Sequence, residues 1–149
     1  MAQKMVPHLS VSPATEAIEF YKKAFGFEEI MRMPMGGKIG HAELRLGDGV
    51  LFLADEYPQA GSKSPRTLGG TTVTIHIESP DVDKAYDRAI KAGATALMPP
   101  ADMFWGDRYG TLKDPFGHQW SIATHKEDVP PAEMQRRMEE AMKNWKKKE

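Results

Sequence analysis

Hydrophobic and polar residues alternate in two similar series along the chain, one in residues 5–55 and one in residues 71–125. Each series opens with a strand-like alternation, around Leu9 in the first and Ile75 in the second. Apolar residues then recur every three or four positions, which is the spacing of an amphipathic helix, and three more strand-like segments follow. The pattern therefore predicts an α+β fold of two tandem βαβββ modules that form a cup-shaped mixed sheet.

Residues typical of helix ends occur at equivalent places in the two series. Ser12-Pro13 precedes the first helical segment and Gly26 follows it. Ser79-Pro80-Asp81 precedes the second helical segment, which stops at Gly93. Serine and aspartate favour the N-cap, proline fits the first helical turn, and glycine adopts the left-handed conformation that ends a helix. We therefore expect helices from 14 to 25 and from about 81 to 92.

The domain organisation follows from the segments between and after the two series. Residues 56–70 are rich in Pro, Gly and Ser, lack periodicity, and read as a connector. We expect residues 1–126 to form a single domain and residues 127–149 to form a helical tail. The apolar positions of the tail fall on one helix face, at Met134, Met138, Met142 and Trp145. Such a stripe favours packing in a core or a dimer interface over a membrane or ligand contact.

Composition narrows the function classes. The 149 residues contain 20 Lys and Arg against 21 Asp and Glu, and this net charge of -1 argues against nucleic acid as a general partner. The absence of cysteine excludes disulfides, thiolate nucleophiles and zinc-thiolate sites. No apolar run is long enough to span a bilayer, and the N-terminus lacks the features of a secretory signal. We expect a cytoplasmic protein without a membrane partner.

Each helix must cover the apolar face of its own sheet, which leaves the polar face uncovered. The alternation assigns eight apolar residues to the helix side: Leu9, Val11, Ala42, Leu44, Leu46, Val73, Ile75 and Ile77. The opposite face receives His8, Ser10, His41, Glu43, Arg45, Thr72, Thr74, His76 and Glu78, with Phe52, Trp105 and Tyr109 nearby. Two modules side by side would curve these polar faces into a small-molecule cleft. The alternative is a solvated outer face with scattered polar residues.

Several segments resemble a known superfamily. They are AIEFYKKAFGF after the Ser-Pro pair, the hairpin GHAELRLGDG, and the closing FWGDRYGTLKDPFGHQW. Together with the doubled module, they make residues 4–126 similar to the vicinal-oxygen-chelate superfamily of glyoxalases, bleomycin-resistance proteins and extradiol dioxygenases. Within it, the chain resembles the bacterial branch labelled glyoxalase-like or demethylubiquinone-methyltransferase-like. One fold there supports isomerases, transferases, dioxygenases and binding proteins, so the resemblance leaves open whether this chain is an enzyme.

The resemblance also indicates where metal-using members place their ligands, on the first and last strands of each module. Those positions correspond here to Val6, Thr74 and Ser121, and to about Phe52. These side chains do not form the usual divalent site. We therefore expect no metal cofactor at the family positions, although a divalent ion elsewhere remains an alternative.

His8 and His76 lie two residues beyond the family positions, and a shift of two keeps a side chain on the same strand face. Three roles stay open for them: contact with a substrate, structural polar contacts, or ligation of a displaced metal together with Glu43. The predicted substrate-binding residues are His8, Glu43, Phe52, Thr74, His76, Trp105, Tyr109 and Ser121. Among the other histidines, we expect His118 to stabilise the turn before the last strand and His125 to be exposed.

Two functions compete on these grounds. The first is a glyoxalase- or bleomycin-resistance-like protein that binds a small, possibly aromatic molecule in the sheet cleft without a metal. The alternative is a metal-dependent lyase or isomerase of the glyoxalase type, with a displaced metal at His8, His76 and Glu43. Catalytic residues cannot be named from the sequence. The resemblance further implies a homodimer, since members often complete a half-cleft with a partner subunit.

Overall fold

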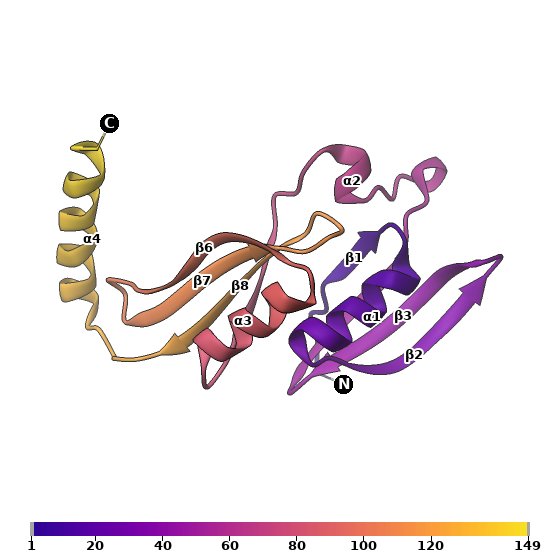
Figure 1. Cartoon of the computed structure of the whole chain (residues 1–149), viewed down its shortest axis with the longest axis horizontal. Helices are drawn as coiled ribbons and strands as arrows, with labels where there is room; N and C mark the ends of the chain where they lie inside the picture. Colours follow the sequence, from indigo (N-terminus) through magenta and orange to yellow (C-terminus); the bar gives the residue numbers. More distant parts are fainter. Residues whose placement is uncertain (1, 149) are drawn as a thin grey trace.

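The two predicted modules follow one another in the computed structural model, which describes residues 2–148 (Figure 1). The first module contains β1 (His8–Val11), α1 (Ala14–Phe25), β2 (Glu28–Met35), β3 (Lys38–Leu46) and β4 (Gly49–Asp55). The second contains β5 (Thr74–Glu78), α3 (Val82–Ala92), β6 (Thr95–Asp102), β7 (Asp107–Lys113) and β8 (Gln119–His125). Helix α4 (Pro131–Lys146) forms the tail. The predicted α+β class, the doubled βαβββ module and the C-terminal helix are confirmed.

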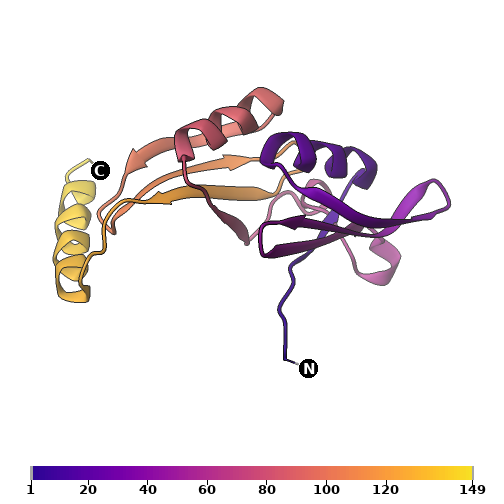
Figure 2. The same cartoon turned by 90° about the horizontal axis from the view of Figure 1, so that it is seen from below.

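The modules have the same topology, each with its own four-stranded mixed sheet. The strand orders are β1-β4-β3-β2 and β5-β8-β7-β6. In each sheet the first and last strands of the module pair in parallel, whereas the other neighbours are antiparallel. Helices α1 and α3 lie on the same side of the molecule, which leaves the opposite faces of both sheets uncovered (Figure 2). We call these uncovered sheet faces the concave face.

Helix α1 ends as expected, at Gly26 with a φ of 83°. Its beginning differs from the expectation. Pro13 occupies the N-cap, and no side chain of that residue caps the helix. Instead the buried carboxylate of Asp55, at the end of β4, accepts hydrogen bonds from the backbone N–H of Ala14 at 3.0 Å and of Ile39 at 2.7 Å. A distant carboxylate thus satisfies a helix N-terminus that local sequence assigned to Ser12.

Helix α3 begins as the sequence indicates, because Asp81 is its N-cap and accepts a hydrogen bond from the Lys84 backbone N–H at 3.2 Å. The connector is more ordered than expected. It contains a 3-10 turn at Pro58–Ala60 and the short helix α2 (Pro65–Leu68). Ser64 caps α2 and also donates to the Glu56 carboxylate, so local side-chain hydrogen bonds stabilise a segment without hydrophobic periodicity.

An aromatic cluster joins the two modules. The fully buried Tyr21 of α1 packs against the fully buried Trp120 of β8, with ring centroids 5.1 Å apart. The Tyr21 hydroxyl donates to the buried Asp114 carboxylate at 2.6 Å, and Trp120 Nε1 donates to the same carboxylate oxygen at 2.8 Å. Burial, and then the adjacent Asp114, raise the pKa of Tyr21 well above its ordinary value. The Tyr21 phenol therefore stays protonated and acts as a donor across the module boundary.

Polar contacts hold the modules side by side outside this cluster. Arg88 of α3 donates to the backbone carbonyl of Lys23 at the end of α1, at 2.9 Å. His118 Nε2 lies 3.0 Å from the backbone carbonyl of Ser10 in β1. The sequence predicted only that His118 stabilises the turn before β8. In the structure, its imidazole also contacts the first module.

Val73 lies differently from the sequence interpretation. It precedes β5 and is 57% exposed, so it does not belong to the helix-covered face. Arg108 of β7 forms salt bridges with Asp83 and Asp102. Within residues 2–148, no helix combines the length and apolar character needed to cross a membrane.

Candidate functional site

The concave face of the first module carries a cluster built by three strands. His8 lies on β1, His41 and Glu43 lie on β3, and Phe52 lies on β4. Strand register places His8 opposite Phe52 in the parallel β1–β4 pair. It places Glu43 opposite Phe52 in the antiparallel β3–β4 pair. Residues opposite one another across a strand pair project from the same face. We call His8, His41, Glu43 and Phe52 the first cluster.

The rings of the first cluster meet edge to face. The ring centroids of His41 and Phe52 are 4.9 Å apart, and that of His8 lies 5.8 Å from His41 and 6.2 Å from Phe52. His41 Nε2 lies 3.1 Å from a carboxylate oxygen of Glu43. Partial burial, and then the neighbouring His41, lower the pKa of His8 below its ordinary value. His8 is therefore neutral at pH 7 and offers one nitrogen as a donor and the other as an acceptor.

The second module carries a matching cluster of one imidazole, one hydroxyl and two aromatic rings. His76 on β5 lies opposite Ser121 on β8, and His76 Nδ1 is 2.7 Å from the Ser121 hydroxyl. The ring of Tyr109 on β7 stacks on His76 at 6.2 Å with an interplanar angle of 23°. Trp105, in the loop before β7, meets Tyr109 edge to face at 5.3 Å. We call His76, Ser121, Tyr109 and Trp105 the second cluster.

A chain of hydrogen bonds extends the second cluster toward the tail. Trp105 Nε1 donates to one carboxylate oxygen of Asp107 at 3.1 Å, and His125 Nδ1 lies 2.9 Å from the other. His125 Nε2 lies 2.7 Å from the carboxylate of Asp128. The hydrogen bonds to Asp107 and then to Asp128 raise the pKa of His125 above its ordinary value. The imidazole of His125 thus lies between two carboxylates at the start of the segment that leads to α4.

The sequence interpretation missed the pairing of Asp107 with His125. The sequence predicted only that His125 is exposed. In the structure, Asp107 and His125 are direct cross-strand partners in the β7–β8 hairpin. Counting outward from the Pro115-Phe116-Gly117 turn would have revealed this register.

Two cavities border His76. One, of about 760 Å³, is lined by polar groups that include Glu78, Asp107, Thr124 and His125. The other, of about 890 Å³, lies between the two modules and is lined by Met5, Pro7, Ile75 and the β3–β4 turn, among others. The imidazole of His76 therefore lies at the border of both cavities.

Seven of the eight candidate residues fall into two groups. His8, Glu43 and Phe52 belong to the first cluster, while His76, Ser121, Tyr109 and Trp105 belong to the second. Thr74 lies exposed at the start of β5, opposite Gln119. The contacts of each cluster lie within its own module, so the arrangement offers two aromatic and imidazole surfaces.

The residues at the superfamily's metal positions do not fit a metal ion. Phe52 and Thr74 are poor ligands by their chemistry, and the Ser121 hydroxyl is engaged with His76. Within residues 2–148, no group of three His, Asp or Glu side chains is arranged to hold a metal. His8, His76 and Glu43, the alternative ligand set, are divided between the two clusters. We therefore derive no chemistry through a metal.

The family becomes clear from comparison with known proteins. The family model described as "Glyoxalase/Bleomycin resistance protein/Dioxygenase superfamily" matches residues 6–122. The chain belongs to this superfamily. Its first and last matched residues lie just before β1 and within β8, so the match includes both modules and both clusters of the concave face.

Individual relatives agree with this assignment. An uncharacterized protein of Mycobacterium bovis is 47% identical over 136 residues, which cover 89% of this chain and 90% of that protein. Among solved structures, TioX from Micromonospora sp. ML1 is 30% identical, with a TM-score of 0.68 over 83% of this chain and 99% of its own. TnmS3, described as an antibiotic-binding protein from Streptomyces sp. CB03234, is 19% identical, with a TM-score of 0.65 over 85% of this chain and 98% of its own. The likeness to TnmS3 shows the fold alone.

Proposed function

We propose that this protein binds a flat, aromatic small molecule on the concave face without the help of a metal. The observation that carries the proposal is the pairing of aromatic rings with imidazoles in both clusters, on a sheet face that no helix covers. Aromatic rings supply apolar contact area and favour edge-to-face or offset packing against a planar ligand. The neutral His8 and the His76–Ser121 pair supply the few directional hydrogen bonds that orient a ligand in such a pocket.

The superfamily supports a binding function without deciding it. Its description includes bleomycin resistance proteins, and TnmS3, which shares the fold, is described as antibiotic binding. The balanced charge of this chain fits a small-molecule partner better than nucleic acid. A cytoplasmic location and the absence of a membrane partner are part of the same proposal.

A homodimer completes the proposed site. Each cluster is open on the concave face. The two modules of one chain contact each other through helices and strand ends on the opposite, helix-covered side. A second copy related by a two-fold axis would place the second cluster of one chain opposite the first cluster of the other. The ligand would then lie between Phe52 and His8 of one copy and the His76–Tyr109 pair of its partner.

Binding is tested on the full-length protein with acridine, anthraquinone-2-sulfonate and bleomycin as probes. We expect at least one of them to raise the melting temperature, because a ligand that binds only the native state stabilises it. Phe52→Leu and Tyr109→Leu should each weaken binding by about fivefold, since each removes an aromatic contact of about 1 kcal/mol. Tyr57→Leu, in the connector region, is the matched control and should leave affinity unchanged.

Elemental analysis of the same preparation distinguishes metal-free binding from the alternative function, a metal-dependent lyase or isomerase. That alternative requires stoichiometric Ni, Zn, Mn or Fe that disappears in the His8→Ala, His76→Ala double variant. Such a result, or the failure of every aromatic probe to shift the melting temperature, would overturn the proposed function.

A further inference from the structure

Trp105 differs from the other rings of the two clusters because it lies in a loop and not in a strand. The loop, residues 103–106, joins β6 to β7, and the indole is half-buried there. In a strand the pleat sets the direction of each side chain, whereas a loop sets no such direction. The edge-to-face contact of Trp105 with Tyr109 therefore depends on how the loop itself is held.

The backbone of this loop is bonded to the segment that follows β8. The N–H of Met103 donates to the carbonyl of Asp107 at 2.8 Å and closes the turn. The carbonyl of Gly106 accepts from the N–H groups of Lys126 at 2.8 Å and Glu127 at 3.0 Å. Gly106 has a φ of 103°, and a Cβ there would overlap the carbonyl of Glu127. Glycine at this position thus permits the close approach of the two segments.

Arg137 in the second turn of α4 adds a bond from the tail to the loop. Its Nη1 donates to the Phe104 backbone carbonyl at 3.2 Å and to the Glu127 carboxylate at 2.6 Å. Its Nε donates to the Glu133 carboxylate at 3.0 Å. Because the guanidinium is a planar fork, partners at several of its N–H groups fix its orientation. Arg137 therefore ties α4 to the residue immediately before Trp105.

The indole of Trp105 is held as well as its backbone. Its Nε1 donates to one carboxylate oxygen of Asp107, whose other oxygen lies 2.9 Å from His125 Nδ1. His125 in turn contacts Asp128, in the segment that leads to α4. The ring of Phe104 packs edge to face against the same indole, with centroids 5.1 Å apart. The orientation of Trp105 therefore depends on its loop neighbours and on the start of the tail.

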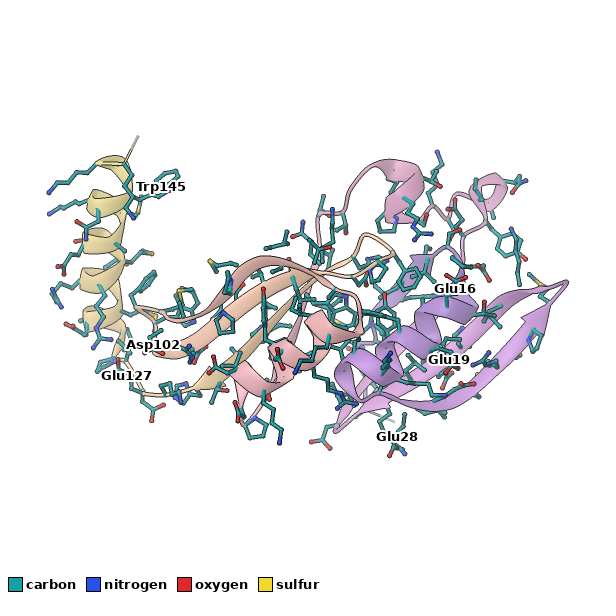
Figure 3. All side chains as sticks on the ribbon, in the orientation of Figure 1. Glu16, Glu19, Glu28, Asp102, Glu127 and Trp145 are labelled. Atoms are coloured by element: carbon teal, nitrogen blue, oxygen red, sulfur yellow. The ribbon has the colours of Figure 1, made fainter. Side chains whose placement is uncertain are left out.

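These supporting residues lie beyond the part of the chain that the superfamily model matches. The match ends at residue 122, whereas His125, Glu127 and Arg137 follow it. Glu127 lies at the base of α4 and Trp145 near its far end, clear of the sheet (Figure 3). Helix α4 meets the second module at this base and projects beyond it (Figures 1 and 2). The support of the loop is thus an addition to the two-module fold.

We propose that Arg137 and residues 125–128 position Trp105 as a preformed wall of the second cluster. The role in ligand binding rests on the proposed function, whereas the immobilisation of the indole does not. A ligand that packs on a ring already held in place loses no binding free energy in ordering that ring. Arg137 acts through the loop and is therefore a positioning residue of the proposed site.

Indole resonances test the positioning directly, because the three tryptophans of the chain lie in three different settings. Trp105 reports on the loop, the buried Trp120 on the module boundary and Trp145 on the tail. In full-length protein with ¹⁵N-labelled tryptophan, Arg137→Met should shift the Trp105 Nε1–H resonance. It should also speed exchange of that proton with solvent by about tenfold, as one lost hydrogen bond to a charged group does in a local opening equilibrium. The Trp120 resonance should stay in place.

Arg136→Met is the matched control for Arg137→Met. Arg136 is the preceding residue of α4, and its hydrogen bonds to Glu133 and Glu140 remain within the helix. Its substitution should leave the shift and the exchange rate of the Trp105 indole unchanged. Equal changes in the two variants, or no change in Arg137→Met, would overturn the positioning.

A double-mutant cycle connects the positioning to the ligand. With the aromatic probe that binds the wild-type protein best, Arg137→Met should weaken binding by about three- to tenfold, because the ligand must then order the indole. In the Trp105→Leu background the same substitution should weaken binding by less than about twofold, because the ring that Arg137 positions is gone. Equal losses in both backgrounds would show that Arg137 acts by another route and would overturn the proposal.

The two measurements separate this inference from the proposed function. If no aromatic probe binds the wild-type protein, the proposed function fails, while the Trp105 resonance still decides whether Arg137 holds the indole. If probes bind but the Trp105 resonance and exchange rate do not respond to Arg137→Met, the positioning fails and the proposed function stands.

Discussion

The Tyr21 hydroxyl on α1 donates a 2.6 Å hydrogen bond to Asp114, 93 residues further along the chain and in the other module. Asp114 Oδ2 also accepts from Trp120 Nε1, while Oδ1 accepts from the backbone N–H groups of Phe116 and His118. One buried carboxylate therefore anchors the turn before β8 and connects it to the first module. This bond joins the two modules even though each has its own sheet.

Tyr21→Phe should lower the free energy of unfolding by about 1–3 kcal/mol, because it leaves a buried carboxylate short of one donor. Urea denaturation followed by circular dichroism measures the change. Tyr57→Phe, with a half-buried ring near the connector, is the matched control and should change stability by less than about 0.5 kcal/mol. Equal losses for the two variants would show that the bond to Asp114 does not stabilise the fold.

Asp55→Asn should cost about 1–3 kcal/mol, since an amide nitrogen cannot accept from the buried N–H of Ala14 or Ile39. Ser12→Ala should cost less than about 0.5 kcal/mol, because Pro13 is the N-cap of α1 and the carboxylate of Asp55, not the hydroxyl of Ser12, accepts from the first N–H of the helix. Thermal and urea unfolding of both variants provide the comparison. If Ser12→Ala lost more stability than Asp55→Asn, Ser12 would be the residue that caps α1, as the sequence indicated.

Ser121→Ala removes the hydroxyl that contacts His76 Nδ1 and should free the imidazole to rotate and change tautomer. We expect ligand affinity to fall by about 2- to 10-fold, which corresponds to one hydrogen bond of about 0.5–1.5 kcal/mol. Calorimetric titration with the best aromatic probe measures affinity, and ¹⁵N spectra of histidine report the tautomer. Ser62→Ala, which removes a similar contact with Ser10, is the control and should alter neither.

The His125 contacts predict a pH-dependent contribution to stability. Asp107 and Asp128 raise the pKa of His125 in the folded protein above its value in the unfolded chain. Its stabilisation is therefore fully present below the unfolded pKa of about 6.5 and is lost as pH rises through the folded pKa. The melting temperature of the wild-type protein should exceed that of His125→Gln at pH 5 to 6, and the two should converge in alkaline solution. A difference that is constant with pH would contradict the assignment.

Much of the fold could be predicted because its signals are local. Alternation in strands, three- and four-residue spacing in α1 and α3, and the glycines at 26 and 93 each depend on neighbouring residues only. The same local rules placed His8, His41, Glu43 and His76 on faces away from the helix-facing residues. Where the decisive partner lies far along the chain, local rules were insufficient, as for the cap of α1 by Asp55.

The candidate site shows the same division between local signals and contacts that join distant residues. The sequence by itself determined that two equivalent modules each expose imidazoles, hydroxyls and aromatic rings, because side-chain direction in a strand follows from its two-residue period. Only the tertiary structure decided that these residues form two clusters, that Asp107 pairs with His125, and that the apolar side of α4 stays exposed. These relationships depend on strand register, on the angle at which modules pack and on the direction in which a helix leaves the sheet. All three are set by contacts between residues distant in sequence, which no local pattern records.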